Sequence, residues 1–491
     1  MPNPPFPRVL IANRGEIAVR ILRTLRDLGI DGVVVYHAAD RLSPAVAAAA
    51  RAVEITGPTP VAAYLDGEQI IAAALETGAQ AIHPGYGFLS ENAAFARKVA
   101  SAGLTFIGPT PAAIELMGDK VRARAFVEKH GFPVAPSAIE DDDPATFVER
   151  ARAVGSPLLI KPSAGGGGKG MRIVRDLATL EDEITRARSE GQRYFGDGRL
   201  YVERYIENPR HIEVQVLGDA QGNVVHLFER ECSVQRRFQK IVEESPSPAL
   251  TPDQRAKICE TAAGIARAAG YRNAGTVEFI YGAGEFFFLE MNTRLQVEHP
   301  VTEEITGIDL VAQQLRVAAG EPLSLRQEDI TATGHSIEYR IYAESAAQGF
   351  TPTTGKVLKL ALPADTRIDL GISEGQQVTS AFDPMLAKLI VHAATRPEAI
   401  AKADRALAGF ALLGCETNTA FLRRLNADPA FAAGEVHTGF LDANPHLAEE
   451  PAPSSETVRR LLATAALLTR PVRDAADAIP PLHSAMGGWR N

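Results

Sequence analysis

The chain has 491 residues, 45% hydrophobic and 23% charged, a composition typical of a soluble globular protein with about three domains. Its net charge of −9 argues against nucleic acid as the main partner. No apolar run approaches the roughly 18 residues of a membrane span, and the N-terminus has no apolar signal core. The three cysteines are far apart and lack metal-ligand spacing, which suits a reducing compartment, so we expect a cytoplasmic protein.

The first region alternates strands and helices. Its apolar pattern predicts a strand over 8–12, a helix over 17–28 and a strand over 32–36, with further alternation to about residue 108. This order predicts a doubly wound, Rossmann-like sheet. No GxGxxG follows the first strand, so a dinucleotide is not expected here. The glycine-rich segment 83–92 could hold an anion or simply form turns.

A helical segment containing Lys120 leads into a small α/β lobe. The lobe contains a glycine loop in which Gly165, Gly167 and Gly170 match GxGxxG, but a β-type segment follows where a Rossmann unit has a helix. The P-loop pattern also fails, because no Lys-Ser/Thr pair follows. We therefore predict a hairpin whose tip could close over phosphates, with Lys161 as a point charge. A flexible surface hairpin is the alternative.

Two strands joined by a short link are predicted over 200–219, with Glu203 and Ile206 on the link and His211 at the start of the second strand. The next segment, 224–246, predicts a strand and then a basic loop containing Arg230, Arg236, Arg237 and Lys240. In an acidic chain, such a cluster suggests an anionic substrate. A solvated surface is the alternative.

The densest chemistry lies in FFFLEMNTRLQVEHP, residues 286–300. Residues 286–289 predict a buried strand, and the polar residues after it must face a cavity because isolated buried charges are costly. Glu278 and Glu290 have the same parity, so a hairpin centred on Gly284 would place them opposite each other. Adjacent carboxylates repel, and a cation between them is the simplest compensation. A salt-bridged loop is the alternative.

Two arginines are candidates for anion handling. Arg294 is bracketed by glutamates, and Arg340 lies in an alternating segment that places it with Glu338 and Tyr342 on the face opposite the core. β-rich segments continue to about residue 391, and a helix follows. The compact part is expected to end near residue 445, before a linker over 445–456 and a helix over 458–470.

Seven segments together resemble the biotin carboxylase family of ATP-grasp enzymes. They are IANRGEIAVRILR, HPGYGFLSEN, LMGDK, KPSAGGGGKGM, ENPRHIEVQVLGD, ERECSVQRRFQK and EMNTRLQVEHPVTE, in the family's order between residue 8 and about residue 445. The resemblance implies an α/β fold with a Rossmann-like N-terminal domain (1–117) and an ATP-grasp domain (118–330) with a mobile glycine-rich lid at about 134–206. A β-rich C-terminal domain (331–446) and a linker with a helical tail (447–491) complete the implied organisation.

The family's reaction is the carboxylation of biotin, so the resemblance implies a ligase that uses ATP, Mg²⁺ or Mn²⁺, bicarbonate and carrier-bound biotin. The implied metal ligands are Glu278, Glu290 and Asn292. The implied bicarbonate and biotin residues are Lys240, Arg294, Gln296, the Val297 backbone, Glu298 as the base and Arg340 as the cation that stabilises the biotin enolate. The implied ATP site contains Lys120, Lys161, Gly165, Gly166, Gly167, Gly168, Met171, Glu203, Ile206, His211, Gln235 and Ile280.

The chain departs from the family pattern at Phe238, where His is common, and at Ala164 in the glycine loop. None of its six methionines precedes a lysine, so no biotin-attachment motif is present and we expect the carrier on another chain or a missing part of this one. The implied partners are a biotin carboxyl carrier, a carboxyltransferase subunit of an acyl-CoA or related carboxylase, and a second copy of the chain. The sequence does not identify the final acceptor. Another ATP-grasp carboxylate–amine ligase and a catalytically silent scaffold are the alternatives.

Overall fold

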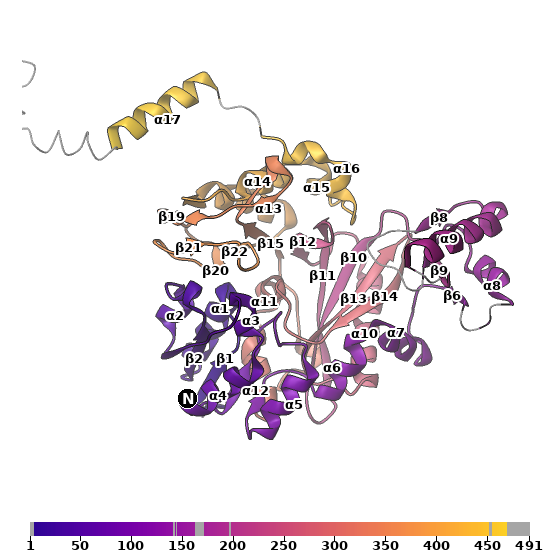
Figure 1. Ribbon diagram of the computed structural model, residues 1–491, viewed down its shortest axis with the longest axis horizontal. Helices are drawn as coiled ribbons and strands as arrows, with labels where there is room; N and C mark the ends of the chain where they lie inside the picture. The colour runs from indigo at the N-terminus through magenta and orange to yellow at the C-terminus, as the bar shows by residue number, and fades with distance from the viewer. Residues whose placement is uncertain are drawn as a thin grey trace, which may run out of the picture. The chain divides into compact units, whose positions relative to one another are not determined.

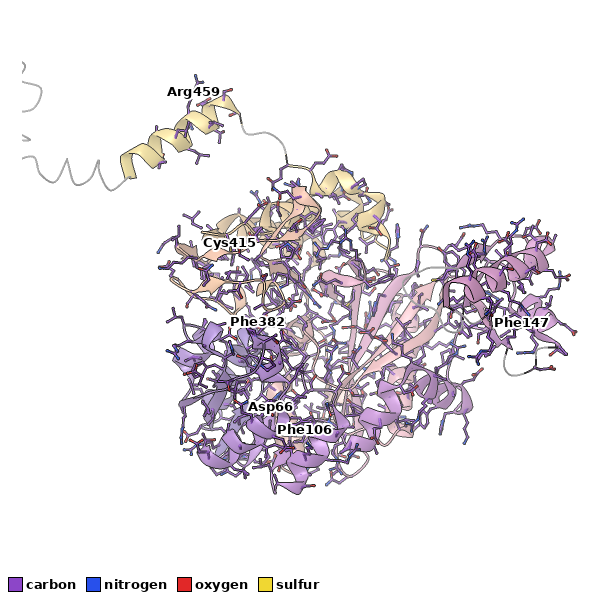
Figure 2. All side chains as sticks on the ribbon, viewed as in Figure 1. Asp66, Phe106, Phe147, Phe382, Cys415 and Arg459 are labelled. Carbon is purple, nitrogen blue, oxygen red and sulfur yellow. The ribbon has the colours of Figure 1, made fainter. Side chains whose placement is uncertain are left out.

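The computed structural model describes residues 4–140, 143, 145–162, 171–195, 198–450 and 454–468. It separates into two compact units, Met1–Leu447 and Ala448–Asn491. In the second unit, the predicted helix is present as α17 (Ser455–Leu468), with Arg459 on it (Figure 2). Within the described ranges, no helix has the length and apolar character needed to cross a membrane.

The first unit begins with a five-stranded parallel sheet of order β3-β2-β1-β4-β5, as the alternating pattern predicted. Figure 1 labels β1 and β2 of this sheet. Its strands are β1 (Arg8–Ile11), β2 (Asp31–Tyr36), β3 (Arg51–Glu54), β4 (Ala81–His83) and β5 (Thr105–Phe106). Its helices are α1 (Gly15–Asp27), α2 (Pro44–Ala48), α3 (Pro60–Tyr64), α4 (Gly67–Thr77) and α5 (Ala93–Ser101). The strand order reverses between β1 and β4, so the loops after these strands meet at the edge where such sheets bind ligands.

A four-stranded sheet of order β6-β9-β7-β8 forms a separate lobe with its own apolar core, in which Phe147 is buried (Figure 2). Its elements are β6 (Ser137–Ile139), α8 (Phe147–Val154), β7 (Leu158–Pro162), β8 (Arg172–Val174), α9 (Leu180–Phe195) and β9 (Leu200–Arg204). β7 and β8 pair antiparallel, which confirms the predicted strand–loop–strand order. The glycines Gly165, Gly166, Gly167 and Gly168 of the predicted hairpin tip lie outside the described residues.

The third sheet has eight strands in the order β14-β13-β10-β11-β12-β15-β22-β20, with antiparallel pairing throughout. Its strands are β10 (Arg210–Gly218), β11 (Val224–Arg236), β12 (Gln239–Ser245), β13 (Asn273–Gly282), β14 (Glu285–Asn292), β15 (His335–Tyr342), β20 (Arg367–Leu370) and β22 (Met385–Ala393). β12 pairs with β15, so one hydrogen-bonded layer joins chain regions on both sides of residue 331.

Helices and short strands surround this sheet (Figure 1). The helices are α6 (Pro111–Gly118), α7 (Lys120–Lys129), α10 (Pro252–Ala268), α11 (His299–Thr306), α12 (Leu310–Ala318), α13 (Arg396–Gly409), α14 (Thr419–Asn426), α15 (Pro429–Ala433) and α16 (Phe440–Ala443). Three two-stranded pairs add β16 (Glu344–Ser345) with β17 (Thr351–Pro352), β18 (Gly355–Lys356) with β21 (Gln377–Val378), and β19 (Lys359–Ala361) with β23 (Ala411–Leu413).

The prediction of a basic loop after the strand that begins at residue 224 is wrong. β11 and β12 form a hairpin whose tip is Arg237-Phe238, and both residues have positive φ, 49° and 67°. Arg230 is fully buried within β11, where its guanidinium donates to Glu213 and to Gln215 at 2.8 Å. The sequence suggested an exposed loop because the carboxylates that neutralise these basic residues lie on other segments of the chain.

The prediction of one polar face on β15 is also wrong in part. Glu338, Arg340 and Tyr342 do share a face, but every residue of β15 is buried, including these three. The strand lies between β12 and β22 and is covered on both sides, so its polar face belongs to an interior cluster of charges. Arg340 is therefore a buried arginine, which requires close carboxylate partners.

Candidate active site

The predicted pair of opposed carboxylates is present at the end of the large sheet. Glu278 on β13 lies directly opposite Glu290 on β14. The hairpin turns at Ala283-Gly284 rather than on Gly284 alone, and a bulge at Leu289 supplies the extra residue that brings the two glutamates into register. Leu289 was predicted to be buried, but the bulge leaves it 45% exposed.

Lys240 lies among three carboxylates. Its ammonium nitrogen is 2.5 Å from Glu213, 3.0 Å from Glu278 and 2.6 Å from Glu298. Burial lowers the pKa of Lys240, but the three glutamates outweigh that effect and hold the pKa well above its usual value. Lys240 is therefore a permanent cation at this point, and it joins the carboxylate hairpin to the start of α11.

Glu298 is fully buried and bridges two cations. Its Oε1 accepts from Lys240, and its Oε2 accepts from Arg340 at 2.9 Å. Arg340 also pairs with Glu243 at 2.5 Å, so two carboxylates fix its guanidinium. Burial raises the pKa of Glu298, yet Lys240, Arg340 and Arg230 together hold it well below the usual range. The group is an anion at neutral pH, with both oxygens already oriented by hydrogen bonds.

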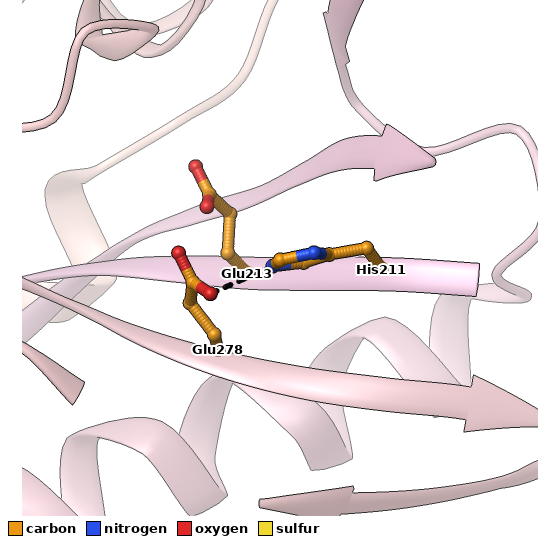
Figure 3. Close-up of side chains that lie close together, drawn as sticks. All are labelled: His211, Glu213 and Glu278. Carbon is orange, nitrogen blue, oxygen red and sulfur yellow. Dashed lines mark ion pairs between the residues drawn. The ribbon is translucent and has the colours of Figure 1, made fainter. Parts of the chain in front are cut away.

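Glu278 has a second partner in His211, whose Nε2 is 2.9 Å from its carboxylate (Figure 3). His211, Glu213 and Glu278 lie close enough to share an ion, and so do Glu213, Cys232 and Glu298; these are the groups of three found among the described residues, and Glu290 belongs to neither. Lys240 already supplies a positive charge to both groups. Glu290 instead pairs with Lys120 at 2.5 Å.

The predicted metal ligands nevertheless fit a divalent ion. Glu278 and Glu290 face each other on adjacent strands and line one cavity, and oxygen donors are the ligands that Mg²⁺ prefers. Asn292 lies beside them: its amide donates to Glu278 at 2.8 Å, and its Oδ1 accepts from Arg294 at 2.9 Å.

Glu91 is a site residue that the sequence did not reveal. It lies in the glycine-rich segment after β4, where its carboxylate accepts from Arg294 at 2.8 Å and from the Thr293 backbone at 3.0 Å. Arg294 also donates to Gln296 at 2.8 Å. The segment 83–92, left open between anion binding and turn geometry, therefore anchors the arginine of the 293–298 loop.

One cavity of about 910 Å³ is lined by all but one of the predicted site residues that the structure describes. Those on its wall are Lys120, Lys161, Glu203, Ile206, His211, Gln235, Lys240, Glu278, Ile280, Glu290, Asn292, Arg294, Gln296, Val297, Glu298 and Arg340. Leu289 and Phe238 also line it, and neither was assigned a role from the sequence. Met171 is 41% exposed and is not among the described residues of this wall.

A second cavity of about 560 Å³ adjoins the first and shares part of its wall. Leu289, Ile206 and Ile280 line both cavities, as do Lys161 and Glu203, which form an ion pair. Ile206 lies on the predicted link, but Glu203 does not, because β9 continues to Arg204 and holds Glu203 in the lobe sheet. Hydrophobic walls with a few charges suit a flat aromatic group joined to an anion.

Comparison with known proteins agrees with this geometry. Family models match residues 5–114 (biotin carboxylase, N-terminal domain), 119–326 (carbamoyl-phosphate synthase L chain, ATP binding domain) and 338–443 (biotin carboxylase C-terminal domain). The chain is 48% identical over 440 residues to biotin carboxylase of Allochromatium vinosum, covering 89% of this chain and 98% of that protein. It is 49% identical over 442 residues to the α subunit of methylcrotonoyl-CoA carboxylase of Oryza sativa, covering 89% of this chain and 60% of that one.

Among solved structures, the biotin carboxylase domain of 2-oxoglutarate carboxylase from Hydrogenobacter thermophilus matches with a TM-score of 0.80 and 44% identity. The match covers 91% of this chain and 99% of that one, which was solved as a dimer with MgADP, ADP and bicarbonate. Fold and site thus define an ATP-grasp enzyme, with a carboxylate hairpin facing a nucleotide-sized cavity. The chain belongs to the biotin carboxylase family, a family of ligases. It spans about 60% of the length of several plant relatives, the methylcrotonoyl-CoA carboxylase α subunits.

Proposed function

We propose that this chain carboxylates biotin on a carrier, using ATP and bicarbonate, as the first half-reaction of a biotin-dependent carboxylase. The observation that supports this most directly is Glu298, a buried carboxylate held between Lys240 and Arg340 in the same cavity as the Glu278–Glu290 pair. The cavity therefore offers a base, cations for a small oxyanion and oxygen ligands for a metal.

The first step would be activation of bicarbonate. Lys240, Arg294 and Gln296, with the Val297 backbone, would bind the anion beside Glu298, whose carboxylate would remove its proton as the anion attacks the γ-phosphate. Lys120 and Lys161 would neutralise phosphate charge, and Mg²⁺ on Glu278 and Glu290 would supply further neutralisation when bound. The resulting carboxyphosphate is labile in water, so the reaction requires a closed cavity.

The second step would be carboxylation of biotin. Collapse of carboxyphosphate gives CO₂ and phosphate, and the phosphate can accept the ureido proton of biotin. The negative charge left on the ureido oxygen needs a fixed cation, which Arg340 would supply from its place between Glu243 and Glu298. The adenine base would lie on Ile206, Ile280 and Leu289, the apolar side chains shared by the two adjoining cavities.

We also propose domain boundaries at 117/118, 330/331 and 446/447, which the spans of the family models support. The partners would be a biotin carboxyl carrier and a carboxyltransferase, because relatives include carboxylase α subunits. A homodimer is proposed because the matched 2-oxoglutarate carboxylase domain was solved as a dimer.

The proposed function is tested by ADP release from the purified chain with ATP, bicarbonate and free biotin. We expect ADP release that rises with biotin and is lost when a chelator removes Mg²⁺. A carboxylate–amine ligase of another kind would ignore biotin, and a catalytically silent scaffold would show no turnover; either result contradicts the proposal.

Replacing Leu289 with alanine should weaken ATP binding with little effect on folding. We expect the KM for ATP to rise by about three- to tenfold, because the side chain would lose apolar contact with the base. The melting temperature should change little, since Leu289 is 45% exposed without ligand. Leu358→Ala, an exposed leucine outside the cavity wall, is the matched control. An unchanged KM for ATP would show that Leu289 does not contact the nucleotide.

A further inference from the structure

Lys388 on β22 is a lysine with no exposed side-chain surface, a rare state for this residue type. Its ammonium donates to the backbone carbonyl of Val297 at 2.7 Å. The nearest carboxylates are farther away, with Glu16 at 3.3 Å and Asp369 at 3.8 Å. The shortest contact of this buried cation is therefore to a neutral carbonyl in the 293–298 loop.

Ion pairing alone does not account for this lysine. Asp369 already pairs with Arg367 at 3.2 Å and with Arg23 at 3.4 Å. Glu16 accepts a hydrogen bond from the Tyr86 hydroxyl through its other oxygen. Buried ion pairs contribute little net stability, because desolvation offsets the attraction.

Lys388 joins segments that are far apart in the sequence. Glu16 lies in the first turn of α1 and Tyr86 in the loop after β4, so this pair comes from the switch point of the N-terminal sheet. Val297 comes from the loop after β14, and Lys388 comes from the large sheet next to Arg340, its cross-strand partner. The ammonium therefore connects the 293–298 loop to the first helix of the N-terminal region and to the large sheet.

A second buried side chain holds the neighbouring carbonyl. The Nδ1 of His299 lies 2.8 Å from the carbonyl oxygen of Gln296, and His299 has no exposed surface. The carbonyls of two successive residues are thus each held by a side chain closed to solvent. Fixing both peptide planes sets the direction of the Val297 N–H and of the Gln296 and Glu298 side chains.

Glu338 is a further buried carboxyl group on which the charge of Lys388 acts. It is fully buried on β15, and neither carboxylate oxygen has a hydrogen-bond partner among the described residues. Burial raises the pKa of Glu338 well above its usual value, and the charge of Lys388 is the largest effect that opposes this shift. Loss of the ammonium would therefore change the charge environment of Glu338, beside Arg340, and would also remove the contact that holds the 293–298 loop.

We propose that Lys388 is a positioning residue for bicarbonate: by holding the Val297 carbonyl, it orients the loop that binds the anion and carries Glu298. The inference deepens the proposed function and rests on it. Lys388 is not on the cavity wall, so it would act through Val297 rather than by touching substrate.

The test compares the wild type with Lys388→Met, which keeps the length of the side chain but removes the ammonium. We expect the KM for bicarbonate to rise about tenfold or more, the usual scale for losing a supporting hydrogen bond, with the KM for ATP within about twofold. Equal changes in both KM values, or no change in either, would overturn the proposal.

A double variant separates positioning from stability. Lys388→Met leaves Glu16 without its cation, and Glu16→Gln/Lys388→Met removes that unpaired charge. We expect the double variant to recover melting temperature relative to Lys388→Met but to retain the raised KM for bicarbonate. Recovery of both would show a merely structural role.

A crystal structure of Lys388→Met gives a readout that does not depend on turnover. We expect the Val297 carbonyl to rotate away from β22, and an unchanged 293–298 loop would overturn the proposal. If the wild type shows no biotin-dependent ADP release, the proposed function fails while this structural comparison still decides whether Lys388 holds the loop.

Discussion

Replacing Glu298 with glutamine is expected to lower biotin-dependent turnover by about 100-fold or more, the usual contribution of a positioned general base. Glutamine keeps the shape of the side chain, and its single amide oxygen can still accept from one of the two cations, Lys240 or Arg340, but it cannot accept a proton from bicarbonate. The loss should therefore appear in kcat, while the KM for ATP stays within about twofold of the wild type.

The pH dependence sharpens this prediction. Lys240 and Arg340 hold the pKa of Glu298 well below its usual range, against the effect of burial, so the carboxylate stays ionised across the neutral range. The defect of Glu298→Gln should thus be about constant between about pH 6 and about pH 9, because Glu298 does not titrate there.

The measurement is biotin-dependent ADP release at saturating ATP, with melting temperature as a check on folding. Glu285→Gln is the matched control: it makes the same chemical change at an exposed position on β14. Near-normal turnover by Glu298→Gln would remove Glu298 from the base role.

Replacing Arg340 with alanine should abolish most biotin carboxylation, with a loss of about 100-fold or more, as for other groups that stabilise a developing oxyanion. Arg340 would act on biotin rather than on bicarbonate, so ADP release in the absence of biotin should fall much less. The ratio of biotin-dependent to biotin-independent ADP release is therefore the decisive quantity.

This variant also leaves Glu243 and Glu298 buried without their shared cation, which costs on the order of 3–5 kcal/mol of stability in comparable cases. Arg340→Lys keeps the charge, and it should fold better than Arg340→Ala while recovering only part of the activity. Arg236→Ala is the control, because Arg236 pairs with Glu344 at 2.7 Å but is not on the cavity wall. An unaltered ratio in Arg340→Ala would contradict a role on biotin.

Sequence patterns predicted those features of the site that depend on residues close together in the sequence. The expected pairing of Glu278 with Glu290 is present, but parity alone did not secure it: the turn at Ala283-Gly284 would pair Glu278 with Leu289, and the bulge at Leu289 restores the predicted pair. The alternating pattern around Arg340 correctly placed it with Glu338 and Tyr342. Strand periodicity fixes which residues share a face, and this information is present in a few neighbouring residues.

Other features depended on partners distant in sequence. Arg230 looked like a loop residue because its partner Glu213 lies on another strand, and burial of a charge cannot be inferred without its counterion. Glu91 and Lys388 were missed for the same reason, since each acts on the 293–298 loop from a remote segment. The bulge at Leu289 has no local sign, because no glycine or proline marks it.

The continuity of the large sheet has a consequence for turnover. Arg340 and the carboxylate hairpin belong to one hydrogen-bonded layer, whereas Lys161 and Glu203 belong to the smaller sheet of the lobe. A swing of the lobe would admit ATP or release ADP without disturbing the spacing between Glu298 and Arg340. Glu298 and Arg340 would thus keep their relative positions from one catalytic cycle to the next. Only the contacts that Lys161 and Glu203 of the lobe make with the nucleotide would form again in each cycle.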